Sequence, residues 1–100
     1  MTTMRRLYVL VSNRLEPVYG CVQGGHAVAQ FLIDNPQEKR TWNNDYLIYL
    51  YADVDKWKAK LDWMGIPYSE FTEPDLDNQL TSIAVQCDDG KMFKNLQLVA

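Results

Sequence analysis

Polar side chains that can exchange protons and form hydrogen bonds recur at helical spacing in the first third of the chain. Gln23, His26 and Gln30 are three and four residues apart, so a helix would place them on one face. His26 is the chain's one histidine, and imidazole titrates nearest to neutral pH. Because Gly25 and Ala27 flank it, a histidine packed against a sheet is the favoured structural interpretation, and proton transfer is the functional one.

A second polar group lies in the second half of the chain. Carboxylates in a loop can orient a water molecule, and a threonine hydroxyl can help to hold it. Asp, Asn and Pro also favour solvated turns, and Thr is a good strand residue, so the structural interpretation is again the simpler one. The group consists of Glu73, Asp75, Asp77, Asn78, Gln79 and Thr81.

The two cysteines predict neither a disulfide framework nor a metal centre. Cys21 and Cys87 with a single histidine have no zinc-ligand spacing, and we expect no metal and no cofactor. A catalytic pair of Cys21 with His26 is disfavoured, because helical residues five apart point in different directions. Both cysteines are expected to be buried small hydrophobic residues.

Two apolar runs predict strands that are buried on both faces, at 7–11 and 46–51. Between them a helix is predicted over 19–35, with a loop before it and Pro36 ending it. Its interior pair Gly24 and Gly25 would weaken a helix by about 1 kcal/mol each, which indicates close packing on a neighbour or a ligand. The apolar residues at helical spacing are Val22, Ala29 and Ile33, and also Cys21, Val28 and Leu32.

A second helix is predicted after the second strand. Asp53 suits the N-cap, and Gly65 suits the left-handed position after the last turn. The residues expected to pack towards the core are Val54, Trp57, Leu61 and Met64, together with Trp63. A polar loop is predicted over 37–44, a turn over 88–90, a helical turn over 91–95 and a short closing strand over 96–99.

The order of elements predicts one α/β domain over 1–100. We expect a two-layer or three-layer sandwich around a four-stranded mixed sheet, formed near 7–12, 45–52, 67–72 and 80–86. The first two strands should be parallel, because a helix joins them. Ligands of such sheets bind beyond the carboxyl ends of the parallel strands. That rim would bring together the loop 13–19, the helical residues Gln23 and His26, and the polar loop 73–79.

Composition narrows the classes of function. The chain has 100 residues, 47% of them apolar, and a net charge of −3, whereas general nucleic-acid binders are usually basic. No apolar run approaches the roughly 20 residues that span a bilayer, so we expect no membrane partner. The apolar run after the N-terminus is too short for a signal peptide, which predicts a cytoplasmic protein.

Three stretches of the sequence together resemble the type 2 peptidyl-tRNA hydrolase family, as a divergent branch of it. The segment 7–15 is similar to the family's opening strand and loop, and Gln23-Gly24-Gly25-His26-Ala27 is similar to its Gln-Cys-Ser-His-Ala motif. The segment from 64 to 73 has the register of the family's Leu-Gly-Leu to Gln-Asp stretch. The resemblance implies a four-stranded mixed sheet flanked by helices, and hydrolysis of the ester that joins a peptide to the 3′ end of tRNA.

The resemblance also implies site residues. Gln23, His26, Glu73 and Thr81 correspond by position, with Glu73 in place of the family's Asp. The family's active-site Lys is replaced by Tyr19, and its Arg-Thr-Gln-Ile-Ala-Pro-Gly stretch is about four residues shorter here. The implied catalytic residues are His26, Glu73 and Thr81. The residues expected to bind substrate are Arg14, Tyr19, Gln23, Asp75 and Asn78, with Arg14 standing in for the lost positive charge.

Three functions remain open from the sequence. The first is hydrolysis of peptidyl- or aminoacyl-tRNA, or of a smaller ester or amide, with Glu73 and Thr81 orienting a water. The missing Lys counts against it, since losing one charge-stabilising donor typically costs about 10²–10³ in rate. The second is a non-catalytic binding module whose rim takes a nucleotide, a peptide or a protein. The third is a domain with a solvated rim that forms a homo-oligomer through its helices or sheet edge.

Overall fold

Two strand–helix units followed by an antiparallel strand pair make up the chain. The computed structural model describes residues 6–88 and 90–99. The strands are β1 (Arg6–Ser12), β2 (Tyr46–Ala52), β3 (Ser69–Glu73) and β4 (Gln79–Cys87), and the helices are α1 (Pro17–Asp34) and α2 (Val54–Met64). Single 3₁₀ turns lie at Gln37–Lys39, Pro74–Leu76 and Lys91–Phe93.

The four strands form one mixed sheet in the order β2-β1-β4-β3. β1 and β2 are parallel, as predicted from the helix that joins them, and β4 pairs antiparallel with both β1 and β3. β1 is a central strand and is buried on both faces, which explains its unbroken apolar run. The predicted α/β class with a four-stranded mixed sheet is therefore confirmed.

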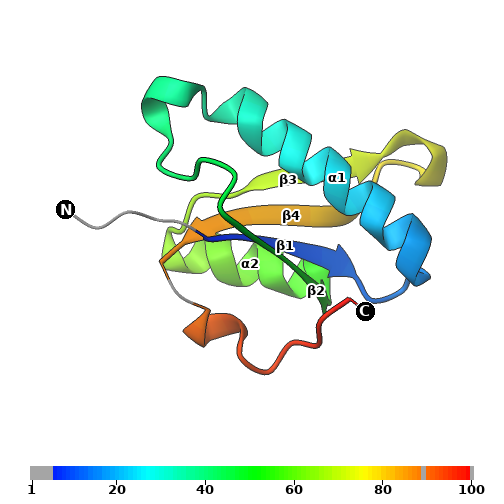
Figure 1. Cartoon of the computed structure of the whole chain (residues 1–100). Helices are drawn as coiled ribbons and strands as arrows, with labels where there is room; N and C mark the ends of the chain where they lie inside the picture. The colour runs from blue at the N-terminus through cyan, green and yellow to red at the C-terminus, as the bar shows by residue number, and fades with distance from the viewer. Residues whose placement is uncertain (1–5, 89, 100) are drawn as a thin grey trace.

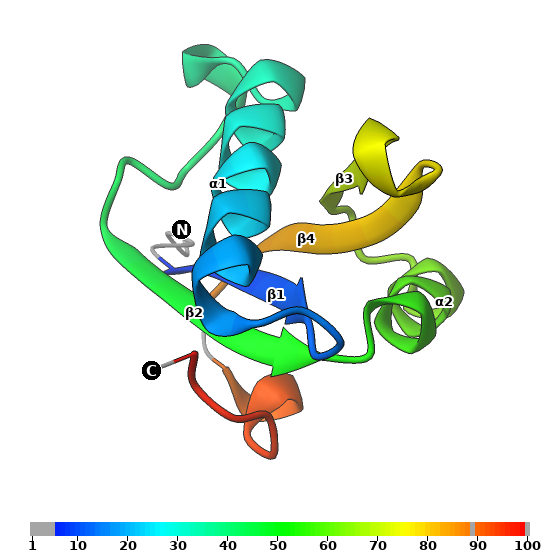
Figure 2. The same ribbon diagram turned by 90° about the vertical axis from the view of Figure 1, so that its right-hand side faces the viewer.

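The helices cover opposite faces of this sheet (Figures 1 and 2), so the sandwich has three layers. Alternate residues of β1 supply the two cores, as the two-residue period of a strand requires. Leu7, Val9 and Val11 pack under α1, whereas Tyr8 and Leu10 pack under α2 and the C-terminal segment. None of the helices in the described ranges is long and apolar enough to cross a membrane.

Local signals in the sequence account for the ends of both helices. α1 begins at Pro17, two residues before the predicted start, and Pro is suited to the first helical position. The Glu16 side chain caps this end by accepting hydrogen bonds from the Val18 and Tyr19 amides. In α2, Asp53 caps the start, and Gly65 ends the helix with a φ of +69°, both as predicted.

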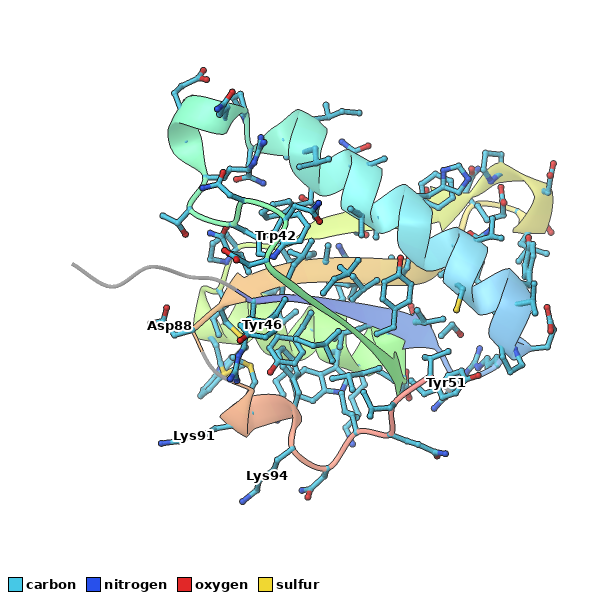
Figure 3. The ribbon with its side chains drawn as sticks, in the orientation of Figure 1. Trp42, Tyr46, Tyr51, Asp88, Lys91 and Lys94 are labelled. Atoms are coloured by element: carbon cyan, nitrogen blue, oxygen red, sulfur yellow. The ribbon has the colours of Figure 1, made fainter. Side chains whose placement is uncertain are left out.

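Several predictions about burial are wrong. β2 is not buried on both faces, because it lies at the edge of the sheet and its first residues are exposed. Trp63 is 88% exposed, because it lies on the side of α2 away from buried Leu61, and Cys21 is exposed on the outer side of α1. Trp42 is only 3% exposed although it sits in the predicted polar loop, and it lies between that loop and the sheet (Figure 3). The predicted closing strand is reduced to one bridge between Leu50 and Leu98. Of the predicted turn at 88–90, residue 89 lies outside the described residues.

The two central glycines of α1 differ in their surroundings. A Cβ added to Gly24 would lie 2.5 Å from Tyr49 Cε2, which confirms the predicted close approach at that position. A Cβ added to Gly25 would have no neighbour within 4 Å, so the same prediction is wrong for Gly25. Gly25 faces away from the sheet, and nothing within the described chain requires its small size.

Candidate functional site

The side chain of Gln23 is the centre of a buried hydrogen-bond network under α1. Its Nε2 donates to Glu73 Oε1 at 2.9 Å, and its Oε1 accepts from Thr81 Oγ1 at 2.6 Å. Its backbone carbonyl accepts a 2.6 Å bond from the Ser82 hydroxyl. The network therefore joins the middle of α1 to the end of β3 and to the start of β4, and it fixes which end of the amide faces Glu73.

Glu73 presents its carboxylate at the edge of this network. Oε1 accepts from Gln23 and, at 3.5 Å, from the Tyr19 hydroxyl, while Oε2 accepts from the Asp75 amide at 3.3 Å. The hydrogen bond from Gln23 is the largest cause that lowers the pKa of Glu73 below its ordinary value; partial desolvation opposes it, and the Asp75 amide, His26 and Tyr19 add to it. Glu73 is therefore a charged, half-buried hydrogen-bond acceptor at neutral pH.

Thr81 holds Gln23 and does not reach solvent. It is fully buried, and its hydroxyl lies 2.6 Å from Gln23 Oε1 and 3.3 Å from the Phe71 carbonyl oxygen. We expected Thr81 to share a water with Glu73; instead the Gln23 amide stands between the two side chains. Thr81 is therefore placed to position Gln23, and through it Glu73.

His26 lies one turn further along α1, with one ring face packed and the residue exposed. Its imidazole stacks on Phe71 with ring centroids 4.3 Å apart and an interplanar angle of 12°. No hydrogen bond ties the imidazole to another residue in the described part of the chain. Phe71 precedes Glu73 by two positions on β3, so both side chains point to the same side of the strand. The imidazole is therefore held on the side of β3 that carries Glu73, near enough to help lower the pKa of that carboxylate.

Tyr19 occupies the position of the lysine in the family that the sequence resembles. Its pKa is raised above the ordinary value, first by desolvation and then by the charges of Glu73 and Asp75, so the hydroxyl is neutral at pH 7. A neutral hydroxyl can donate a hydrogen bond but supplies no positive charge. Tyr19 therefore offers a neutral hydrogen-bond donor at the position where the family that the sequence resembles has a positively charged lysine.

The other predicted binding residues have mainly structural contacts. The backbone N–H of Asp75 donates to Glu73 Oε2, and the backbone N–H of Asn78 donates a 2.9 Å hydrogen bond to the Glu73 backbone carbonyl oxygen. Asn78 has a φ of +60°, a conformation that Asn tolerates better than most residues. Arg14 lies in the turn after β1, where its amide binds the Ser12 hydroxyl, and its guanidinium is not brought to Glu73 by any described bond.

The network includes residues that sequence reasoning missed. Phe71 gives His26 its stacking surface, and Ser82 anchors the Gln23 backbone. The strand period was a usable signal for Phe71, because it places residues 71 and 73 on one side. Among residues 6–88 and 90–99, no three metal-ligating side chains are grouped to hold an ion. The described chemistry is that of a carboxylate, an imidazole and a phenol contributed by the end of β3 and the facing side of α1.

Comparison with known proteins shows the fold and no more. No protein-family model matches the chain, and no curated protein matches it. Among solved structures, the chain is similar to Atu0240 from Agrobacterium tumefaciens strain C58, which is described as a protein of unknown function. The TM-score is 0.68 and the identity 12%, with all of both chains covered. At this identity the likeness establishes a shared architecture, a mixed sheet between helices.

Proposed function

We propose that this protein is a slow hydrolase of the type 2 peptidyl-tRNA hydrolase class, acting on a peptidyl- or aminoacyl-tRNA ester. The observation that supports the proposal is the Gln23 amide, which binds both Glu73 and Thr81, 50 and 58 positions away. Together with His26, these are the residues that the family resemblance carries over by position. Residues so distant in sequence converge because α1 crosses the sheet above the junction of β3 and β4.

The chemistry assigns one task to each accessible group. Glu73 accepts a hydrogen bond from a water and directs its oxygen at the ester carbonyl carbon. The C–O bond to the ribose 3′ oxygen then breaks, and that oxygen takes up a proton, which the imidazole of His26 transfers from the attacking water. Such positioned proton transfer is typically worth about 10²–10⁴ in rate. The Tyr19 hydroxyl donates to the developing oxyanion.

Two features of the site account for a slow reaction. The neutral hydroxyl of Tyr19 stabilises an oxyanion less than an ammonium group would. The carboxylates of Glu73 and Asp75 repel the phosphates of an approaching tRNA, an effect that is strongest at low ionic strength.

A second function, a binding module without turnover, is favoured by one specific observation. Both carboxylate oxygens of Glu73 already accept hydrogen bonds, and its pKa is lowered, which makes it a weak base. Such a carboxylate is suited to hold a hydrogen-bond donor of a nucleotide, peptide or protein partner. Binding would then use the same rim with no bond broken.

Hydrolysis of labelled peptidyl-tRNA by purified protein separates these functions. The variant Glu73→Gln should lose turnover, because the neutral amide no longer orients the water. Glu70→Gln is the matched control, since Glu70 lies on the same strand but pairs with Lys58 at 2.7 Å. Turnover that persists in Glu73→Gln overturns the site. Peptidyl-tRNA bound without turnover by the native protein supports the binding module and rejects the hydrolase.

A further inference from the structure

The outer face of α1 lacks the charges that a solvated surface helix normally carries. From Pro17 to Asp34 the helix contains one carboxylate, at its last residue, and no Lys or Arg. Five of the chain's six lysines lie elsewhere, three on α2 and two in the segment that follows β4. The latter two, Lys91 and Lys94, point away from the body on the side opposite α1 (Figure 3). A helix that covers a sheet usually carries charged residues on its solvent side. The outer face of α1 lacks them and resembles a face that packs against another protein surface.

Large apolar side chains occupy this face. Val18 is 73% exposed and Val22 is 53% exposed, and Leu32 is also exposed near the other end of the helix. With 3.6 residues per turn, these residues lie within about 80° of one another around the helix axis, and Gly25 and Ala29 fall between them. We call Val18, Val22, Gly25, Ala29 and Leu32 the outer stripe.

The outer stripe is directed away from the rest of the molecule. The buried residues of α1 are Gly20, Gln23, Gly24, Ala27 and Phe31, which lie on the opposite side of the helix. In Figures 1 and 2, α1 has the sheet on one side only, and no helix or strand of the described chain covers its other side. Exposed contiguous apolar surface of this kind marks an interaction site.

Gly25 lies at the centre of the outer stripe, and no contact within the described chain requires a glycine there. Glycine weakens a helix relative to alanine, yet a Cβ at Gly25 would meet no atom within 4 Å. A missing side chain on an outward face lets the backbone of a second helix come close. Gly24 differs, because its small size is required by Tyr49.

We propose that the outer stripe binds a second copy of this chain, with the two α1 helices antiparallel and a two-fold axis at Gly25. The stripe is nearly symmetric about Gly25: Val18 and Leu32 lie seven positions before and after it, and Val22 and Ala29 lie three before and four after it. The antiparallel pair therefore sets Val18 against the partner's Leu32, and Val22 opposite the partner's Val28, one residue from the partner's Ala29. A two-fold interface requires one patch that matches itself in this way.

The surroundings of the stripe fit this occupant. An apolar groove beside Val18 is lined by Pro17, Cys21, Val22 and Val99, and it lies where the partner's Leu32 would enter. Because neither stripe is charged, pairing two copies brings no like charges together. Tyr19 and His26 lie to one side of the stripe, so the candidate site stays open in the pair.

Mass measurement by light scattering or sedimentation, over a concentration series of the full chain, tests the proposal. We expect twice the 11.6 kDa chain mass for the native protein. Val22→Glu should halve this mass by placing two charges in the interface. Trp63→Glu is the control, since it charges a still more exposed apolar residue on α2 and should leave the dimer intact. A native protein that stays monomeric at every concentration, or a dimer lost only in Trp63→Glu, overturns the proposal.

Cross-linking tests the register independently of folding losses. With Cys21→Ser as background, Gly25→Cys should form a disulfide-linked dimer on mild oxidation, because the two positions meet at the axis. Ile33→Cys is the control, since the same register separates its two copies by about 24 Å along the helices. Equal cross-linking at both positions, or at Ile33→Cys alone, would reject the antiparallel pair.

Discussion

The side-chain amide of Gln23 donates a 2.9 Å hydrogen bond to the carboxylate of Glu73. This bond ties a helix on one face of the sheet to the end of an edge strand, and it is the main reason why the carboxylate keeps a low pKa in a half-buried place. α1 therefore positions Glu73 through Gln23, and the charge state of the Glu73 carboxylate depends on this buried, neutral side chain.

Gln23→Leu should lower the free energy of unfolding by about 1–3 kcal/mol, because the buried Thr81 hydroxyl loses its closest partner. Urea denaturation measures this. Gln30→Leu is the control: Gln30 lies on the same helix, and its side chain donates to the exposed Asp34, so its change should stay within about 0.5 kcal/mol. Equal losses in the two variants would show that the network adds little to stability.

The lowered pKa of Glu73 predicts the pH dependence of both stability and turnover. A carboxyl whose pKa is lower in the folded state adds stability above its unfolded pKa, near 4.5, and this contribution is lost as the pH falls through the folded value. The difference in unfolding free energy between native protein and Glu73→Gln should therefore shrink below pH 4.5. NMR titration of the Glu73 carboxyl, and an acid limb of the rate profile below pH 4.5, are the checks.

Much of the fold could be predicted because its central strands carry a strong signal. The apolar run in β1 continues over both faces, as burial between two helices requires, and Asp53 and Gly65 mark the ends of α2 by local chemistry. These features depend only on neighbouring residues. The antiparallel pairing of β3 with β4 agrees with the mixed sheet that the order of the elements predicts.

The face that α1 buries was not predictable in the same way. Apart from Phe31, its buried residues are small or polar, whereas large apolar residues such as Val18 and Val22 are exposed. Hydrophobic periodicity therefore identifies the helix but not the side that packs. Gly24 and Gln23 face inward because Tyr49 and Thr81 are there, and those contacts depend on the folded sheet. The hydrogen bonds of the site are missed for the same reason.

Trp42→Ala should lower the free energy of unfolding by about 3–5 kcal/mol, as is typical of buried Trp truncations. The indole N–H of Trp42 donates to the Tyr46 carbonyl oxygen at 3.0 Å. The rings of Trp42 and Phe31 form a T-shaped pair with their centroids 6.1 Å apart. Chemical denaturation gives the value. Trp63→Ala removes an exposed indole and should change stability by no more than about 0.5 kcal/mol. A larger loss from Trp63→Ala than from Trp42→Ala would contradict the burial of the two residues.

Tyr19→Lys should raise turnover of peptidyl-tRNA, and the affinity for tRNA, because it puts a positive charge beside Glu73 where the phenol now lies 3.5 Å away. The gain should be larger at low ionic strength, since salt screens the attraction to phosphate. Assays over a salt series test both effects. Tyr19→Phe is the control: it removes the hydroxyl without adding charge, so it should bring no gain at any salt concentration. A gain independent of salt would argue against an electrostatic cause.

Gly24→Ala and Gly25→Ala should change stability in opposite directions, although they are neighbours on one helix. Alanine favours the helix over glycine by about 1 kcal/mol at either position. At Gly24 the new methyl group would lie 2.5 Å from Tyr49 Cε2, and such overpacking typically costs about 1–3 kcal/mol, so this variant should lose stability. At Gly25 the methyl meets nothing, and the gain in helix propensity remains. Thermal unfolding at a concentration too low for the proposed dimer to form measures both, and a loss of stability in Gly25→Ala would show that α1 packs by its outer side as well.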